Sequence, residues 1–236
     1  MTVPVRAVVF DLWNTIAEWP DEEWARVRPR VAERLGLTPQ EFDERWYGEL
    51  ARMREMGPFA DVLAHFDVTP EAAEEVVELR RAVTRQGLVP VPGAAETIAA
   101  LRDRGFLIGL ITVCSEDVAL LWEETAFHGL FDVEVFSATA GLRKPDPRIY
   151  RLALEQLGVE PGEAVFVGDG ANDELAGAER VGMTAIGVDS PGGELGDWDG
   201  LRIRALPELL ELLEGGVVKR DAVAPEGAAG PEQRGS

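Results

Sequence analysis

The chain has 236 residues, with 43 acidic and 23 basic side chains and a formal net charge of -20. Such a balance excludes the basic patch of a nucleic-acid-binding protein and the polybasic segment that anionic membranes attract. Hydrophobic residues make up 46% of the chain, enough to build the core of one large domain or two small ones. We expect a small-molecule substrate, no nucleic acid and no membrane partner, and a monomer or a homodimer.

The single cysteine, Cys114, excludes an intrachain disulfide and is typical of a reducing compartment. No apolar run approaches the roughly 20 residues that a membrane helix needs. The first apolar run ends at Asp11 and is too short for a signal peptide. These features predict a cytoplasmic protein. Lysine is rare: only Lys144 and Lys219 occur, and all other basic residues are arginine.

The first predicted element is a buried parallel strand over residues 6–10, directly before Asp11. Residues 16–88 are rich in Glu, Arg and Ala, with apolar residues at helical spacing, and predict three to four helices and no strand. From residue 89 onward, strands and helices alternate. The predicted strands are 106–112, 133–136, 164–167 and 183–188, and the predicted helices are 93–104, 117–127, 146–157, 172–181 and 206–213.

This order predicts an α/β fold, a Rossmann-like parallel sheet with helices on both faces. The predicted core comprises residues 1–15 and 89–214, interrupted after its first strand by an all-helical cap over residues 16–88. Residues 215–236 have the composition of a disordered tail. The core carries 24 acidic and 10 basic residues. Because ligands bind at the carboxyl ends of such strands, this excess of acid suits a bound cation.

Polar side chains occur at four points where these strands end. They are Asp11, Thr112, Lys144, and the pair Asp169 and Asp173. Each is ordinary alone, since Asp at a strand end is commonly a turn residue or a helix cap. Together, carboxylates at neighbouring strand tips repel one another and need a cation, and oxygen ligands suit Mg²⁺. A lysine and a hydroxyl group can bind phosphate oxygens.

These motifs, in this order, resemble those of the haloacid dehalogenase (HAD) superfamily of hydrolases, with a helical cap after the first strand. The family's first motif, Asp-x-Asp-x-Thr, reads Asp11-Leu12-Trp13-Asn14-Thr15 here. Thr112 matches the second motif, Lys144 the third, and Gly168-Asp169 with Asp173 the fourth. The resemblance covers about residues 1–214.

The resemblance implies a hydrolase in which Asp11 attacks phosphorus and forms an aspartyl-phosphate. It implies Mg²⁺ as the cofactor, bound by Asp11, the backbone carbonyl of Trp13, Asp169 and Asp173. It also implies that Thr112 and Lys144 hold phosphoryl oxygens, and that Lys144 screens Asp11 from Asp169.

Trp13 departs from the family pattern, because the phosphatases carry there the Asp that acts as general acid and base. Indole cannot transfer that proton, a step typically worth about 10²–10⁴-fold in rate. The family's dehalogenases also lack this Asp, and they displace halide from carbon without a metal. Retention of Asp169 and Asp173 favours a Mg²⁺-dependent phosphohydrolase acting on a small phosphorylated metabolite, with a 2-haloacid dehalogenase as the alternative.

Two further possibilities remain open. The chain could be a low-activity regulatory or binding protein of the same fold, or the cap could supply a substitute acid. The candidate acids are Glu18, Asp21, Glu22 and Glu23. Cap arginines that could grip an anionic substrate are Arg26, Arg28, Arg45 and Arg52. Trp13 and Trp19 are candidates to line an apolar pocket.

Overall fold

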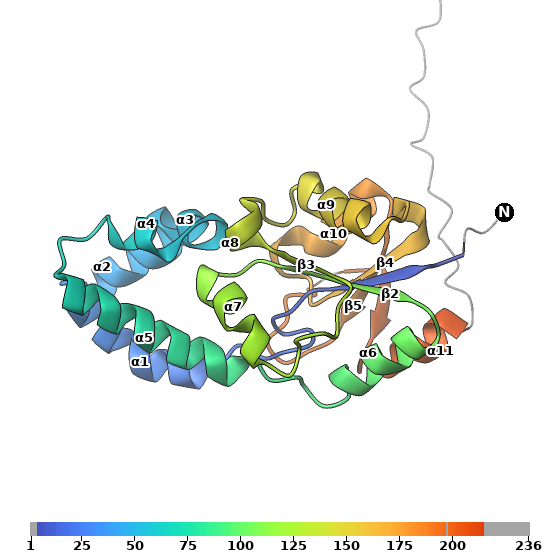
Figure 1. Ribbon diagram of the computed structural model, residues 1–236, viewed down its shortest axis with the longest axis horizontal. Coiled ribbons are helices and arrows are strands. Elements are labelled where there is room, and N and C mark those ends of the chain that lie inside the picture. Colours follow the sequence, from blue (N-terminus) through green and yellow to red (C-terminus); the bar gives the residue numbers. More distant parts are fainter. Residues whose placement is uncertain (1–3, 197, 215–236) are drawn as a thin grey trace, which may run out of the picture.

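A parallel β-sheet forms the centre of the computed structural model, which describes residues 4–196 and 198–214 (Figure 1). Among these residues the sheet has six strands in the order β3-β2-β1-β4-β5-β6, and all neighbours are parallel. The strands are β1 (Ala7–Phe10), β2 (Leu107–Thr112), β3 (Val133–Phe136), β4 (Ala164–Gly168), β5 (Thr184–Val188) and β6 (Leu201–Ile203). The predicted α/β fold is confirmed. The predicted tail, 215–236, lies outside the described residues.

Helices cover both faces of the sheet. One face packs against α6 (Ala94–Asp103), α7 (Glu116–Leu121) and α11 (Glu208–Glu214), and the other against α9 (Pro147–Leu157) and α10 (Glu174–Val181). A short helix, α8 (Ser137–Ala140), follows β3. Strand β1 is buried along its whole length: Val8 and Phe10 belong to one hydrophobic cluster, and Ala7 and Val9 to the other. This two-sided burial explains why its sequence is continuously apolar rather than alternating.

The register of the sheet brings three strand ends together. Phe10 pairs with Leu110 of β2 on one side and with Val167 of β4 on the other. Asp11, the next residue, donates its backbone N–H to the Val167 carbonyl at 2.8 Å. The residues that follow β1, β2 and β4 therefore share one edge of the sheet.

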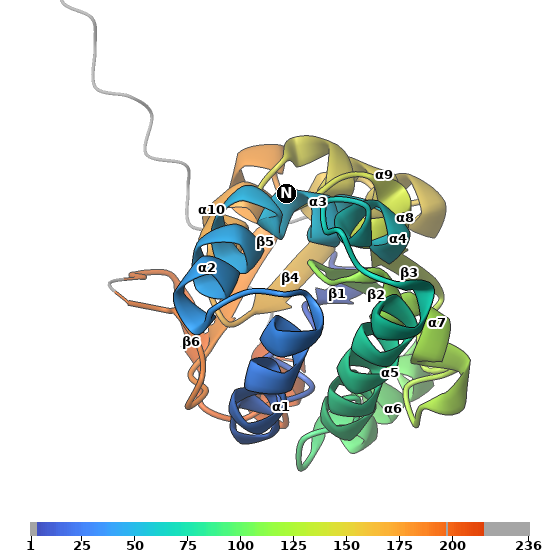
Figure 2. The same cartoon turned by 90° about the vertical axis from the view of Figure 1, so that its left-hand side faces the viewer.

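The segment between β1 and α6 is helical and lies beside that edge (Figures 1 and 2). Its elements are α1 (Asp21–Arg34), α2 (Pro39–Asp43), a π-helical stretch (Glu44–Glu49), α3 (Ala51–Met56), α4 (Phe59–Leu63) and α5 (Pro70–Gly87). We call α1 to α5 the helical insert. It has its own buried cluster, rich in aromatic side chains such as Trp24, Phe42 and Trp46. The described residues of the insert contain no strand, as expected, whereas the proposed domain boundaries remain a prediction.

Several elements differ from expectation. Within the described residues, the insert has five α-helices where three to four were predicted, and α8 was not predicted. The helix predicted from residue 172 begins at Glu174, because Asn172 and Asp173 both adopt left-handed backbone angles, with φ of 56° and 54°. The helix predicted over 117–127 ends at Leu121 and continues as a short 3₁₀ turn. Strand β6 was not predicted, since two of its three residues are exposed and it lacks an apolar run. No helix in the described ranges is long and apolar enough to cross a membrane.

Candidate active site

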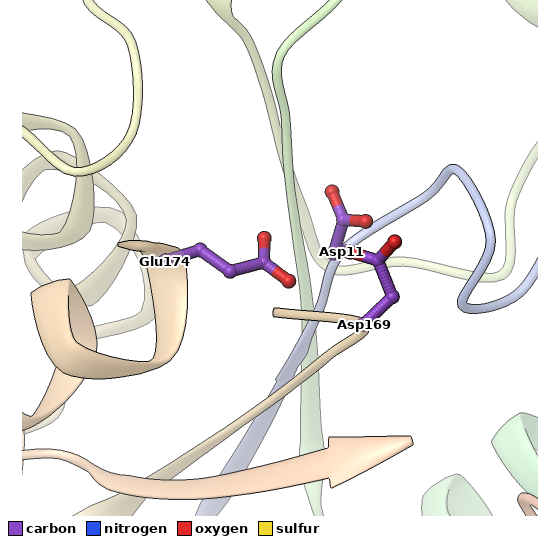
Figure 3. Close-up of side chains that lie close together, drawn as sticks. All are labelled: Asp11, Asp169 and Glu174. Atoms are coloured by element: carbon purple, nitrogen blue, oxygen red, sulfur yellow. The ribbon is translucent and has the colours of Figure 1, made fainter. Parts of the chain in front are cut away.

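Three buried carboxylates meet at the carboxyl edge of the sheet (Figure 3). Asp11 follows β1, Asp169 follows β4, and Glu174 opens α10. One oxygen of each lies within 4.8 Å of the others, and none of the three residues is more than 5% exposed. Carboxylates this close repel one another strongly in a buried setting, so the cluster requires positive charge.

Lys144 supplies part of that charge. Its Nζ donates hydrogen bonds to Asp11 Oδ1 and to Glu174 Oε2, and the residue is only 2% exposed. Burial by itself would lower the pKa of Lys144, but the two carboxylates outweigh that effect and raise the pKa above its ordinary value. With all four groups ionised, one cation faces three anions, leaving two negative charges in excess.

Two oxygen atoms at this edge are buried without a hydrogen-bond partner: Asp169 Oδ2 and Thr112 Oγ1. Asp169 Oδ1, by contrast, accepts the Ala171 backbone N–H at 3.0 Å. Burial, followed by the charge of Asp11, raises the pKa of Asp169. Buried polar atoms are rarely left unpaired, so these oxygens are suited to ligands that arrive from outside the chain. The donor set, three carboxylates with one unpartnered oxygen, fits a hard cation such as Mg²⁺.

The sequence did not predict Glu174 as a site residue. Its side chain is fully buried, it accepts the Gly170 backbone N–H at 3.1 Å, and burial followed by the charge of Asp11 raises its pKa well above the ordinary value. A Cβ at Gly168 would lie 2.0 Å from Glu174 Oε1, so glycine is required there. One signal could have revealed it: Glu174 shares a helical face with Gly177 and Ala178, both buried.

Asp173, which was predicted as a metal ligand, is exposed and lies outside the carboxylate cluster. Its left-handed backbone directs the chain so that the following residue enters the cluster instead. The structure thus brings together Asp11, Lys144, Asp169 and Thr112 at one edge of the sheet. The roles of Asp173 and of the Trp13 carbonyl as metal ligands stay predictions.

Arg143, the neighbour of Lys144, connects this edge to the helical insert. One of its guanidinium nitrogens lies 3.2 Å from Glu55 Oε2 of α3, and the other donates to Asn172 Oδ1 at 2.7 Å. The loop that carries Lys144 therefore contacts both the insert and the loop that leads into α10.

Trp13 and Trp19 lie beside the strand ends, with ring centroids 5.1 Å apart in an edge-to-face arrangement. Both line a cavity of about 330 Å³ between the insert and the loops after β1 and β2. The two indoles thus line a cavity, as predicted, but charged side chains such as Arg54 and Arg80 line it too, so it is not apolar throughout. Asp21, one of the candidate substitute acids, borders the same cavity but is exposed.

The family model for haloacid dehalogenase-like hydrolases matches residues 5–182. The chain belongs to this family and is a hydrolase, as the four motifs predicted.

Relatives in the family include named phosphatases. The chain is 30% identical to a glyceraldehyde 3-phosphate phosphatase of Methanopyrus kandleri over 78% of this chain and 84% of that protein. It is 31% identical to a phosphatase of Mycobacterium tuberculosis over 89% of this chain and 98% of that protein.

Solved structures of both chemical types are similar. A HAD phosphatase from Thermococcus onnurineus superposes with a TM-score of 0.67 at 29% identity, covering 89% of this chain and 99% of that one. A 2-haloacid dehalogenase from Pseudomonas syringae gives 0.69 at 26% identity with the same coverage. The overall fold therefore does not separate the two activities, and the site residues must do so.

Proposed function

We propose that the protein is a Mg²⁺-dependent phosphohydrolase that hydrolyses a small phosphorylated metabolite through an aspartyl-phosphate at Asp11. The observation that carries the proposal is the unpartnered, buried Oδ2 of Asp169 beside two further carboxylates. A reaction at carbon that needs no metal would gain nothing from this excess of buried negative charge. The named phosphatases among the relatives support the same choice.

Each side chain has a defined part in this proposal. Asp11 is the nucleophile, and the hydrogen bond from Lys144 to its Oδ1 fixes the carboxylate while screening it from Asp169. Thr112, with its buried and unpartnered hydroxyl, donates to a phosphoryl oxygen. Asp11, Asp169 and Glu174 would hold Mg²⁺, which would neutralise charge on the transferring phosphoryl group. Water then cleaves the aspartyl-phosphate and frees Asp11.

A dehalogenase remains the second candidate because of one residue. Trp13 occupies the place of the usual general acid, and it faces the cavity with Trp19. An apolar wall without a proton donor suits a leaving group that departs as a stable anion, as halide does. Under the phosphohydrolase proposal, the same wall restricts the enzyme to esters whose leaving groups need little protonation.

A two-substrate assay separates the candidates. The protein is incubated with p-nitrophenyl phosphate and with 2-chloropropionate, each with Mg²⁺ and with EDTA, and the release of phosphate and chloride is measured. The proposal expects phosphate release that stops in EDTA. Chloride release that continues in EDTA, without phosphate release, would overturn it in favour of the dehalogenase.

A further inference from the structure

The cavity between the helical insert and the strand ends combines indole walls with buried guanidinium groups. Its walls include Trp13, Trp19, Trp24 and Trp46, and Arg54 and Arg80 contribute the two cations. Its floor includes Val113, which directly follows Thr112. A volume of about 330 Å³ falls at the lower end of the range for small-ligand sites. We call this cavity the tryptophan chamber.

Arg80 is unusually deep for an arginine, at 5% exposed. Its guanidinium carbon lies 5.0 Å from the Trp24 ring centroid and 5.6 Å from that of Trp46. One terminal nitrogen donates to Ser115 Oγ at 2.7 Å and lies 3.6 Å from Asp117 Oδ2, which only partly satisfies the group. Its Nε is buried and has no hydrogen-bond partner.

Arg54 also lies near Trp46, with its guanidinium carbon 5.1 Å from that ring centroid. It donates to the Trp46 carbonyl at 3.0 Å, and its contact with Glu55 Oε1 is long, at 3.5 Å. Burial, followed by the nearby charge of Arg80, lowers the pKa of Arg54 to about 10. The charged form of Arg54 is thus disfavoured by burial and by the charge of Arg80.

Charged groups of both signs line the chamber. Arg54 and Arg80 are its cations, and Glu55, which also lines it, contacts Arg54 at 3.5 Å. Asp117 lies 3.6 Å from Arg80. Asp21 also borders the chamber but is exposed to solvent, where its charge is screened. The two guanidinium groups are less exposed than the carboxylates of the lining: the side chains of Arg80 and Arg54 are 6% and 13% exposed, and that of Glu55 is 18% exposed.

We propose that Arg54 and Arg80 bind a carboxylate on the leaving group of the substrate, so that the enzyme acts on aryl phosphates that carry a carboxylate. The inference rests on the proposed phosphohydrolase function and names its substrate class. Three observations converge: the guanidinium pair selects an anion, the indole walls select a planar apolar body, and Trp13 in place of an acid selects a phenolic leaving group. Arginine suits this task because its planar donors match a carboxylate.

Two matched probes test the proposal: 4-(carboxymethyl)phenyl phosphate and its neutral isostere, 4-(carbamoylmethyl)phenyl phosphate. A methylene group insulates the phenol from either substituent, so the leaving groups have nearly equal reactivity. Because a hydrogen-bonded charge contributes about 1.5–3 kcal/mol, we expect kcat/KM to favour the carboxylate probe by about 10-fold or more, mainly through KM. A ratio near one in the unmodified enzyme would overturn the inference while leaving the phosphohydrolase intact.

Variants assign the preference to the arginines. In Arg54→Gln the ratio of kcat/KM between the carboxylate probe and the amide probe should fall towards one. Arg85→Gln is the control, since Arg85 lies on the same helix as Arg80 but pairs with Glu124 on the surface. Arg80→Lys keeps the charge of the most buried position and should retain part of the preference. An unchanged ratio in Arg54→Gln would contradict the assignment.

A binding measurement keeps the inference separate from the proposed reaction. Four of the six tryptophans line the chamber, so ligand binding should change intrinsic fluorescence. We expect 4-hydroxyphenylacetate to shift the signal at concentrations about 10-fold lower than its amide does, and Arg54→Gln to remove this difference. If neither probe is hydrolysed but this preference is seen, the proposed function fails and the anion site stands. Equal binding of acid and amide would remove the anion site.

Discussion

The Lys144 ammonium group bonds the Asp11 carboxylate, although 133 positions separate the two residues in the chain. The same nitrogen bonds Glu174, so one buried cation holds carboxylates from two elements. Lys144 and Asp11 are almost completely buried, so neither can replace this contact with bonds to water. The geometry of the site and the stability of the fold therefore depend on a single side chain.

Replacing Lys144 by Met should destabilise the protein as well as inactivate it. The change leaves two buried carboxylates without their cation, and breaking such buried pairs typically costs about 3–5 kcal/mol. Urea denaturation in EDTA measures the loss in the free energy of unfolding. Adding Glu174→Gln to Lys144→Met should restore part of that loss, since one of the stranded charges is removed. A single variant as stable as the unmodified protein would contradict the ionised arrangement.

Asp11→Asn should abolish phosphate release while the protein stays folded. The amide keeps the size of the side chain but is not a nucleophile, and loss of a covalent nucleophile typically costs at least about 10³-fold in rate. Single-turnover assays with p-nitrophenyl phosphate measure the rate, and thermal unfolding verifies the fold. Full activity in this variant would show that another group attacks phosphorus.

Glu174 and Asp173 form a matched pair for the metal site. The Glu174→Gln change should weaken Mg²⁺ binding by about 10-fold or more, since it removes a carboxylate from the buried cluster. Asp173→Asn should have a much smaller effect, because Asp173 is exposed and outside that cluster. Titration of the thermal midpoint with Mg²⁺ gives both affinities without an activity assay. If Asp173→Asn weakened Mg²⁺ binding more than Glu174→Gln did, Asp173 would be the metal ligand, as the family motif implies.

Stabilisation by Mg²⁺ should increase with pH. Burial raises the pKa of Asp169 above 3.8 and that of Glu174 well above 4.5. Both groups therefore retain protons in the folded protein at pH values where the unfolded chain has lost them. Without metal, they make the folded state less favourable as pH rises through this window.

Because carboxylate ligands bind metal in their deprotonated form, the ion must displace these retained protons at low pH. The rise in the thermal midpoint on adding Mg²⁺ should accordingly be small near pH 5 and larger at pH 8. Glu174→Gln should flatten this dependence. A midpoint shift that is the same at both pH values would argue against carboxylates with raised pKa as ligands.

The sequence predicted the sheet well because its strands are short, apolar runs that are buried on both faces, as in β1 and β4. It also predicted the positions of Asp11, Thr112 and Lys144, since each lies directly at or beyond a strand end or in a distinctive loop. Periodicity could not reveal where α10 begins, because this depends on two consecutive left-handed residues. That difference of two residues places Glu174 in the buried carboxylate cluster and leaves Asp173 exposed outside it.

Tertiary contacts also decided which arginines line the tryptophan chamber. The four candidates proposed from the sequence were chosen by composition, and two of them, Arg26 and Arg28, pair with Glu23 and Asp43. Arg54 and Arg80 have no local sequence feature that distinguishes them from these. Their burial arises from packing against Trp46, which no local pattern encodes.

The contacts of Arg143 have a consequence for building chimaeras within this family. This residue contacts both Glu55 of the helical insert and Asn172 of the loop before α10. The insert is therefore connected through Arg143 to the loop that leads to the carboxylate cluster. An insert transplanted from a relative would lack the contact with Arg143 unless it carried an acidic residue at the position of Glu55. To exchange specificity between relatives, the helical insert must therefore be transferred together with the core loop that contacts it.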